Sequence, residues 1–119
     1  MITITLQRDE SGWLRRFTAT GHAGYGEHGS DIICAAVTAL AATAIGSMQE
    51  LAGLDPARQL QDGLIAFDLP EQADLSGEQQ RITAILLQSL MIGCRQIQQS
   101  YGSRYIRFRQ KRYKGGHAK

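Results

Sequence analysis

A histidine, a run of glycines and a cysteine follow one another closely in the first third of the chain. His22 ends an alternating segment, glycines crowd residues 21–30, and Cys34 opens a long apolar stretch. A cysteine in the first turn of a helix faces unpaired amide N–H groups and the positive end of the helix dipole, which favour a thiolate. A nearby imidazole completes a nucleophile at neutral pH, and first-turn amides can bind the oxyanion formed when an acyl carbonyl is attacked. This spacing therefore favours thiol-dependent chemistry on an acyl group.

The same cysteine also fits a packed core. Free cysteine is among the most often buried residues, and the segment Ile-Ile-Cys-Ala-Ala around Cys34 is apolar. The second cysteine, Cys94, sits between Leu90 and Ile97 in the middle of a helical pattern, with no histidine near it in sequence. We expect Cys94 to be a core residue, whereas Cys34 stays open to both interpretations on its position alone.

Two further residues, Asp31 and His28, lie close to this pair in sequence. Asp31 precedes Cys34 by one helical turn, where it can cap the helix or orient the histidine. A metal site would combine His22, His28 and Cys34, with Asp31 as a fourth ligand, but this spacing matches none of the familiar zinc patterns. We therefore expect neither a metal nor a cofactor.

Hydrophobic periodicity and turn residues predict the elements that position these side chains. Asp62–Gly63 is a strong hairpin turn, Ser30 or Asp31 is the N-cap of the first helix, and Gly53 ends it. Ser76 and Gln79 form a capping box at the start of the second helix. The expected elements are strands at 2–8 and 13–20, a glycine-rich loop at 21–30, a helix from 31 to 53, strands at 57–60 and 64–69, a helix from 76 to 102, and a strand at 105–110.

The order ββαββαβ predicts an α+β domain in which a mainly antiparallel sheet packs with two helices. We expect one domain over residues 1–114 and a disordered tail at 115–119, because the tail has nothing to bury. A chain of 119 residues is the length of a single domain.

Composition narrows the class of protein. Hydrophobic residues are 43%, and the formal net charge is +2, so the chain is not a wholly disordered one. Gly, Thr, Ser and Gln interrupt its apolar stretches, from which we expect no membrane span. The first residues, Met-Ile-Thr-Ile-Thr, lack the basic-then-apolar layout of a signal peptide. We therefore expect a cytoplasmic protein with reduced cysteines.

The C-terminal segment 104–114 carries six basic residues among eleven, interleaved with aromatic ones. On a strand, Arg107, Arg109 and Lys111 line the solvent face, a possible footprint for RNA phosphates. The same charges equally protect an edge strand from pairing with other chains, and we favour this second interpretation. Nucleic-acid binding through this strand stays the alternative.

The segment Gly21-His22-Ala23, followed by Asp31-Ile32-Ile33-Cys34-Ala35-Ala36-Val37, resembles the ribosomal-processing cysteine proteases, the Prp family. The resemblance covers the whole chain in element order. It implies a small cytoplasmic α+β homodimer that removes an N-terminal extension from a large-subunit ribosomal protein, with a catalytic dyad of His22 and Cys34. It also implies supporting roles for Gly21 and for Thr38, where the family usually has serine. The glycine-rich loop, with Gly24, Gly26 and Gly29, then lies near the active site.

The leading hypothesis is therefore a cysteine endopeptidase acting on a ribosomal-protein extension. His22 takes the proton of Cys34, the thiolate attacks a peptide carbonyl, and the flexible loop closes over the peptide. The alternative is a non-enzymatic ribosome- or RNA-associated module that uses the basic C-terminal strand.

Overall fold

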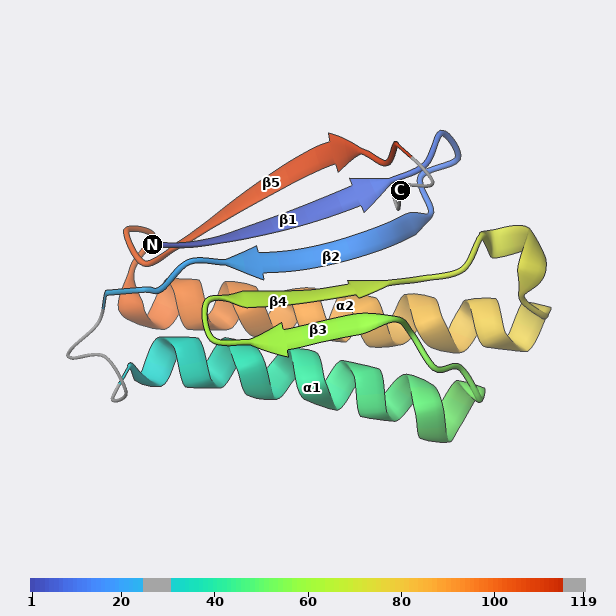
Figure 1. Ribbon diagram of the computed structural model, residues 1–119, viewed down its shortest axis with the longest axis horizontal. Coiled ribbons are helices and arrows are strands. Elements are labelled where there is room, and N and C mark those ends of the chain that lie inside the picture. Colours follow the sequence, from blue (N-terminus) through green and yellow to red (C-terminus); the bar gives the residue numbers. More distant parts are fainter. Residues whose placement is uncertain (25–30, 115–119) are drawn as a thin grey trace.

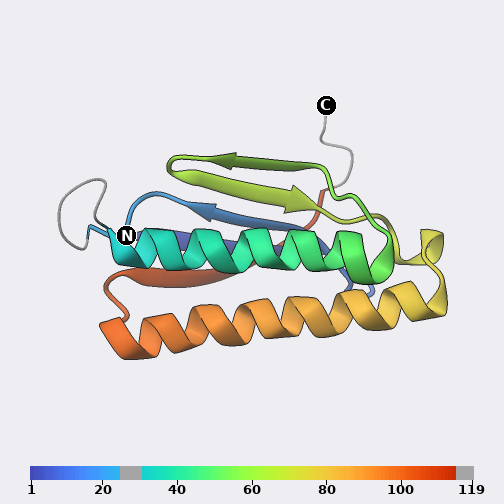
Figure 2. The same cartoon turned by 90° about the horizontal axis from the view of Figure 1, so that it is seen from below.

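The computed structural model describes residues 1–24 and 31–114. These residues form two layers, in which two helices lie side by side against one face of a five-stranded sheet (Figures 1 and 2). The order ββαββαβ and the α+β class are as the sequence predicts, with one added 3₁₀ turn at Gln72–Asp74. The elements are β1 (Ile2–Arg8), β2 (Leu14–Thr20), α1 (Ile32–Ala52), β3 (Arg58–Gln61), β4 (Leu64–Asp68), α2 (Gly77–Tyr101) and β5 (Ile106–Arg112).

The strands lie in the order β3-β4-β2-β1-β5. The pairs β1–β2, β2–β4 and β3–β4 are antiparallel, as expected for two hairpins. Strand β5 pairs in parallel with β1, with Ile2 opposite Ile106. The sheet is therefore mainly antiparallel with one parallel edge, because the chain returns through α2 before it adds the last strand.

The core fills the space between the sheet and the helices. Alternate residues of β1 point toward the helices and are buried, which gives Ile2, Ile4 and Leu6 the pattern expected for a half-buried strand. Phe17 of β2 and Phe67 of β4 lie opposite each other, and their rings stack with centroids 5.1 Å apart. This ring pair anchors the centre of the sheet to the helical layer.

Helix α1 begins and ends where the sequence predicts. Asp31 is its N-cap, and Gly53 follows it in the left-handed conformation at φ +68°. Its buried residues recur every three or four positions and form one face: Ile33, Val37, Ala41, Ala44, Ile45, Met48 and Ala52. That face packs against the sheet and α2 (Figure 2).

The expectation that no segment is apolar enough to span a membrane is wrong for α1. With 21 residues, this helix is long and apolar enough to cross a bilayer by length and composition. Its Gly, Ser and Thr residues are nearly neutral in hydropathy, so they do not interrupt the apolar run. The same composition suits a helix that packs one face against its neighbours, and a third of this apolar stretch is buried in the structure.

Strand β5 forms one edge of the sheet and runs to Arg112, two residues beyond its predicted end. Arg107, Arg109 and Lys111 on it are exposed. A charged edge strand of this kind is the device that keeps sheets from pairing edge to edge. The tail 115–119, predicted to be disordered, lies outside the described residues.

Three segments meet at one end of the two layers: the end of β2, the start of α1 and the turn between β3 and β4 (Figure 1). The first two carry His22 and Cys34. The third segment is the Asp62–Gly63 turn that the sequence predicts as a hairpin without assigning it to the site.

Candidate active site

His22 is held by the backbone on both sides of it. Gly21 has φ +92°, and its amide donates to the carbonyl of Gly63 at 3.0 Å. The amino group of Met1 donates to the carbonyl of His22. A Cβ at Gly21 would lie 2.6 Å from the Met1 carbonyl oxygen, so this position requires glycine both for its conformation and for its space. The supporting residue Gly21 thus shapes the chain that presents His22.

Cys34 lies in the first turn of α1, under the carboxylate that caps the helix. Asp31 Oδ1 accepts from the amides of Ile33 and Cys34, both at 3.1 Å. Its other oxygen, Oδ2, lies 3.2 Å from Cys34 Sγ and accepts the thiol hydrogen, while the Ala23 amide points at Sγ from 3.4 Å. Asp31 therefore caps the helix, which is one of the two roles that its position predicts.

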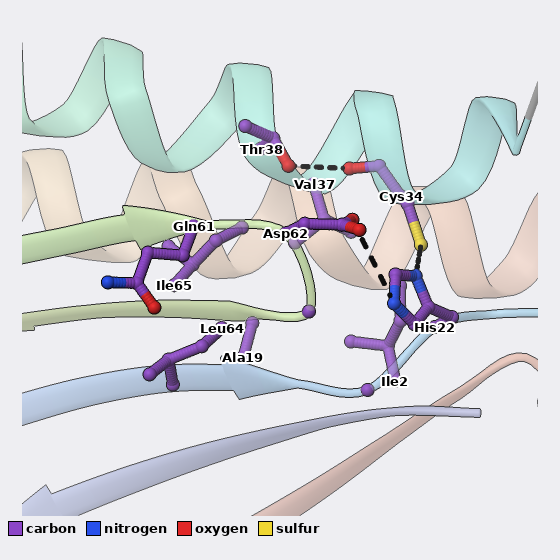
Figure 3. Close-up of a pocket in the computed structure, with 12 residues that line it drawn as sticks. Ile2, Ala19, His22, Cys34, Val37, Thr38, Gln61, Asp62, Leu64 and Ile65 are labelled. Atoms are coloured by element: carbon purple, nitrogen blue, oxygen red, sulfur yellow. Dashed lines mark hydrogen bonds and ion pairs between the residues drawn. The ribbon is translucent and has the colours of Figure 1, made fainter. Parts of the chain in front are cut away.

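The imidazole of His22 lies between a thiol and a carboxylate (Figure 3). Its Nδ1 is 3.9 Å from Cys34 Sγ, and its Nε2 is 3.8 Å from Asp62 Oδ1. Catalytic hydrogen bonds are often this long before substrate binds. Tertiary structure thus brings together the histidine and cysteine that the sequence singles out, and it adds an acid from the β3–β4 turn.

The environment raises the pKa of Cys34 above its ordinary value, which corrects the expectation that the helix start favours a thiolate. Burial of the thiol is the main cause, and the carboxylates of Asp31 and Asp62 add to it, while the Ala23 amide acts in the opposite direction. The amides of Ile33 and Cys34 already donate to Asp31. The positive potential of these two amides is therefore directed at the Asp31 carboxylate and not at the sulfur, and the thiol needs a base to lose its proton.

The same hydrogen bonds also bear on the expected oxyanion site. Because Asp31 accepts from the amides of Ile33 and Cys34, these two first-turn donors are engaged and do not face a substrate. The Ala23 amide, 3.4 Å from the sulfur, is a backbone donor next to the thiol that sequence reasoning did not single out.

Thr38 lies one turn after Cys34 and supports the helix. Its hydroxyl donates to the backbone carbonyl of Cys34 at 2.8 Å. This is the local bond that Ser and Thr side chains commonly make to the residue four positions earlier. The side chain also lines the pocket around the thiol. A serine at this position can make the same bond.

A pocket opens over the pair (Figure 3). Its lining includes Gln61 at the end of β3 and Asp62 and Gly63 of the β3–β4 turn, which sequence reasoning missed as part of the site. The only signal was the Asp-Gly turn itself, and nothing in the sequence places that turn against His22. Of the predicted active-site loop, Gly24 has φ +76°, while Gly26 and Gly29 lie outside the described residues.

Cys94 is a core residue, as predicted. It is fully buried in α2, and burial raises the pKa of its thiol to about 11. As for metals, His28 lies outside the described residues. Within residues 1–24 and 31–114, no group of three or more His, Cys, Asp or Glu side chains is arranged to hold a metal ion.

A two-layer α+β fold with a cysteine and a histidine facing each other at a helix start defines the class of thiol-dependent hydrolases. The family model of the cysteine protease Prp matches residues 1–107. The chain therefore belongs to the Prp family of cysteine proteases, and it is a peptidase.

Two kinds of relative agree with this membership. The ribosomal processing cysteine protease Prp of Bacillus subtilis is 31% identical over 103 residues, which cover 85% of this chain and 90% of that protein. The S. aureus protease Prp, solved with a covalently linked product peptide, superposes with a TM-score of 0.77 at 25% identity, covering 93% of this chain and all of that one. A Streptococcus mutans protein superposes with a TM-score of 0.74 at 26% identity, covering 95% and 96% of the two chains. The prediction of a cysteine peptidase is thereby confirmed.

Proposed function

We propose that this protein is an endopeptidase that removes an N-terminal extension from a large-subunit ribosomal protein, with Cys34 as nucleophile and His22 as base. The observation that carries the assignment is the approach of His22 Nδ1 to Cys34 Sγ at 3.9 Å, inside a pocket open to solvent. The substrate class is supported by the B. subtilis relative, which is named for ribosomal processing.

The reaction begins with a protonated thiol, because the surroundings of Cys34 raise its pKa. His22 Nδ1 takes the proton from Sγ, and the thiolate attacks the carbonyl carbon of the scissile peptide bond. The tetrahedral intermediate collapses as the imidazolium protonates the leaving amine, which leaves an acyl group on Cys34. Water, deprotonated by His22, then hydrolyses this thioester and restores the thiol. A covalently linked product peptide in the S. aureus relative is in keeping with a covalent route.

Gly21 and Thr38 act through the backbone in this proposal, whereas Asp31 contacts both the helix amides and the thiol. Asp31 fixes the first turn of α1, Gly21 lets the chain pass Met1 and present His22, and Thr38 bonds the Cys34 carbonyl. None of these residues needs to exchange a proton with the substrate.

We also propose that the protein acts as a cytoplasmic homodimer, with residues 1–114 as its folded domain. A ribosomal-protein substrate requires the enzyme to work where ribosomes are assembled. The dimer rests on the family resemblance, and light scattering of the purified protein measures it directly.

The test is incubation of the purified protein with the host's extended ribosomal protein, followed by intact-mass analysis. Wild type should remove the extension, Cys34→Ala should not, and Cys94→Ala, which removes the buried thiol, should cleave like wild type per folded molecule. Cleavage by Cys34→Ala would contradict the nucleophile assignment. No cleavage by any of the three would shift the function to the RNA-associated module, which requires salt-sensitive RNA binding.

A further inference from the structure

The β3–β4 turn packs directly against the imidazole of His22. The amide of Gly21 donates to the carbonyl of Gly63, and Thr20 at the end of β2 pairs with Leu64 at the start of β4. Gly63 has φ +79°, and a Cβ there would lie 3.2 Å from His22 Nε2. The turn is therefore fixed to the strand end that carries His22, with no room between its backbone and the ring.

This packing brings Asp62 to the ring nitrogen that faces away from the thiol. Asp62 Oδ1 lies 3.8 Å from Nε2, while Nδ1 faces Cys34 Sγ (Figure 3). A carboxylate on that side favours the tautomer with hydrogen on Nε2, which leaves Nδ1 unprotonated toward the thiol. It also stabilises the imidazolium that forms when Nδ1 accepts the proton.

We propose that Asp62 is a positioning residue for His22, so that the nucleophile, the base and an acid of the β3–β4 turn work as one set. This inference rests on the proposed function and deepens it. Asp31 is the other nearby carboxylate, and its side chain bonds the thiol and the helix amides. Asp62 is the acid that the structure places on the far side of the imidazole.

The expected effect of Asp62 is modest, since the charges are open to water. The side chains of His22 and Asp62 are 44% and 72% exposed, and 3.8 Å is an ion-pair distance longer than a hydrogen bond. Exposed ion pairs contribute little because solvent screens them. Replacement of Asp62 should therefore slow cleavage by roughly 1.5-fold to fivefold, far less than loss of the buried acid in a serine-protease triad.

The test variant is Asp62→Asn, which removes the charge and keeps the shape. Asn-Gly is as favourable as Asp-Gly in a two-residue hairpin turn, so the fold is preserved. Glu50→Gln is the matched control, because Glu50 is an exposed acid near the far end of α1. We expect kcat/KM for the extended ribosomal protein to fall for Asp62→Asn, to recover in part for Asp62→Glu, and to stay unchanged for Glu50→Gln.

The pH dependence of Cys34 alkylation by iodoacetamide separates positioning from a structural role and needs no substrate. The described groups that face His22 are Cys34 with its partner Asp31, the Asp62 carboxylate and the Met1 amino group. In Asp62→Asn, alkylation at pH 7 should slow, because the imidazolium that accompanies the thiolate loses its partner. In the alkaline range, the pKa of the Cys34 thiol should be lower in Asp62→Asn than in wild type, because one of the carboxylates that raise it is gone.

Slower alkylation of Cys34 at pH 7 together with a lower thiol pKa in the alkaline range supports the proposal. Damage to the fold would instead lower the reactivity of Cys34 in both pH ranges, or expose Cys34 and Cys94 together. Cleavage and alkylation by Asp62→Asn that match Glu50→Gln would overturn it. Failure of the proposed function looks different: wild type itself then leaves the ribosomal protein intact, while the alkylation profiles still decide the role of Asp62.

Discussion

Asp31 holds Cys34 at two points, since Oδ1 accepts from its amide at 3.1 Å and Oδ2 accepts from its thiol, with the sulfur 3.2 Å away. One carboxylate thus fixes the helix start and keeps the thiol protonated until a base acts. Burial of the thiol is the main cause of the raised pKa of Cys34, and Asp31 adds to it, so the proposed reaction needs His22 as a base.

Replacement of Asp31 should separate the two roles. Asp31→Ala loses the cap and should lower the free energy of unfolding by about 1 kcal/mol. It should also lower the pKa of Cys34, because a hydrogen-bond acceptor and a negative charge that both raise it are removed. Thermal unfolding and the pH dependence of iodoacetamide alkylation measure the two effects.

The control for this prediction is Asp31→Ser, because serine caps a helix without a charge. Asp31→Ser should recover the stability and keep the lowered thiol pKa. An alkylation profile for Asp31→Ser that coincides with that of wild type would show that the carboxylate does not control the thiol.

Removal of the base should abolish most of the activity without unfolding the protein. His22→Ala should lower kcat/KM for the extended ribosomal protein by roughly 10²- to 10⁴-fold, the range typical of a general base. The imidazole is 44% exposed, so its loss leaves no large cavity in the core. Steady-state cleavage with circular dichroism of the same sample provides the check, and full activity in a folded His22→Ala protein would refute the dyad.

Gly21 should tolerate substitution by alanine far less well than Gly12, a glycine with nearly the same φ. Gly21 and Gly12 have φ +92° and φ +91°, but a Cβ at Gly12 meets nothing within 4 Å, whereas one at Gly21 meets the Met1 carbonyl oxygen. Gly12→Ala should cost about 1 kcal/mol of stability through backbone strain and leave cleavage unchanged. Gly21→Ala should cost more stability and also displace His22, so that cleavage falls. Chemical denaturation and cleavage assays compare the two variants, and equal losses in both would remove the case for Gly21 in the site.

The buried thiol of Cys94 should make stability fall in alkaline solution. Its folded pKa is raised to about 11 from an ordinary 9.0, so the unfolded chain releases this proton first as the pH rises. The contribution is fully present below pH 9 and is lost between about 9 and 11. It is worth on the order of 2 to 3 kcal/mol.

Urea denaturation across this pH range measures the effect of Cys94. The variant Cys94→Ala, which has no thiol to titrate there, should show a correspondingly shallower dependence on pH. Peptide mapping after alkylation at neutral pH should find the label on Cys34 and not on Cys94 while the protein is folded. Equal labelling of both thiols in the native state would contradict the burial of Cys94.

The sequence determined the elements, because these follow from local chemistry, and it singled out His22 and Cys34 as candidates. Alternation over residues 2–8, the cap at Asp31, the turn at Asp62–Gly63 and the capping box at Ser76 each depend on neighbours a few residues away. The glycine-histidine segment and the aspartate-cysteine segment identified the pair in the same way.

Tertiary structure alone decided what surrounds that pair. The parallel pairing of β5 with β1, the approach of Asp62 to His22 and the raised pKa of Cys34 all join parts of the chain far apart in sequence. Electrostatic effects and burial depend on distances through space, and no spacing along the chain fixes these. The candidate reactive residues are therefore readable from the sequence, whereas their protonation and their partners arise only when the chain folds.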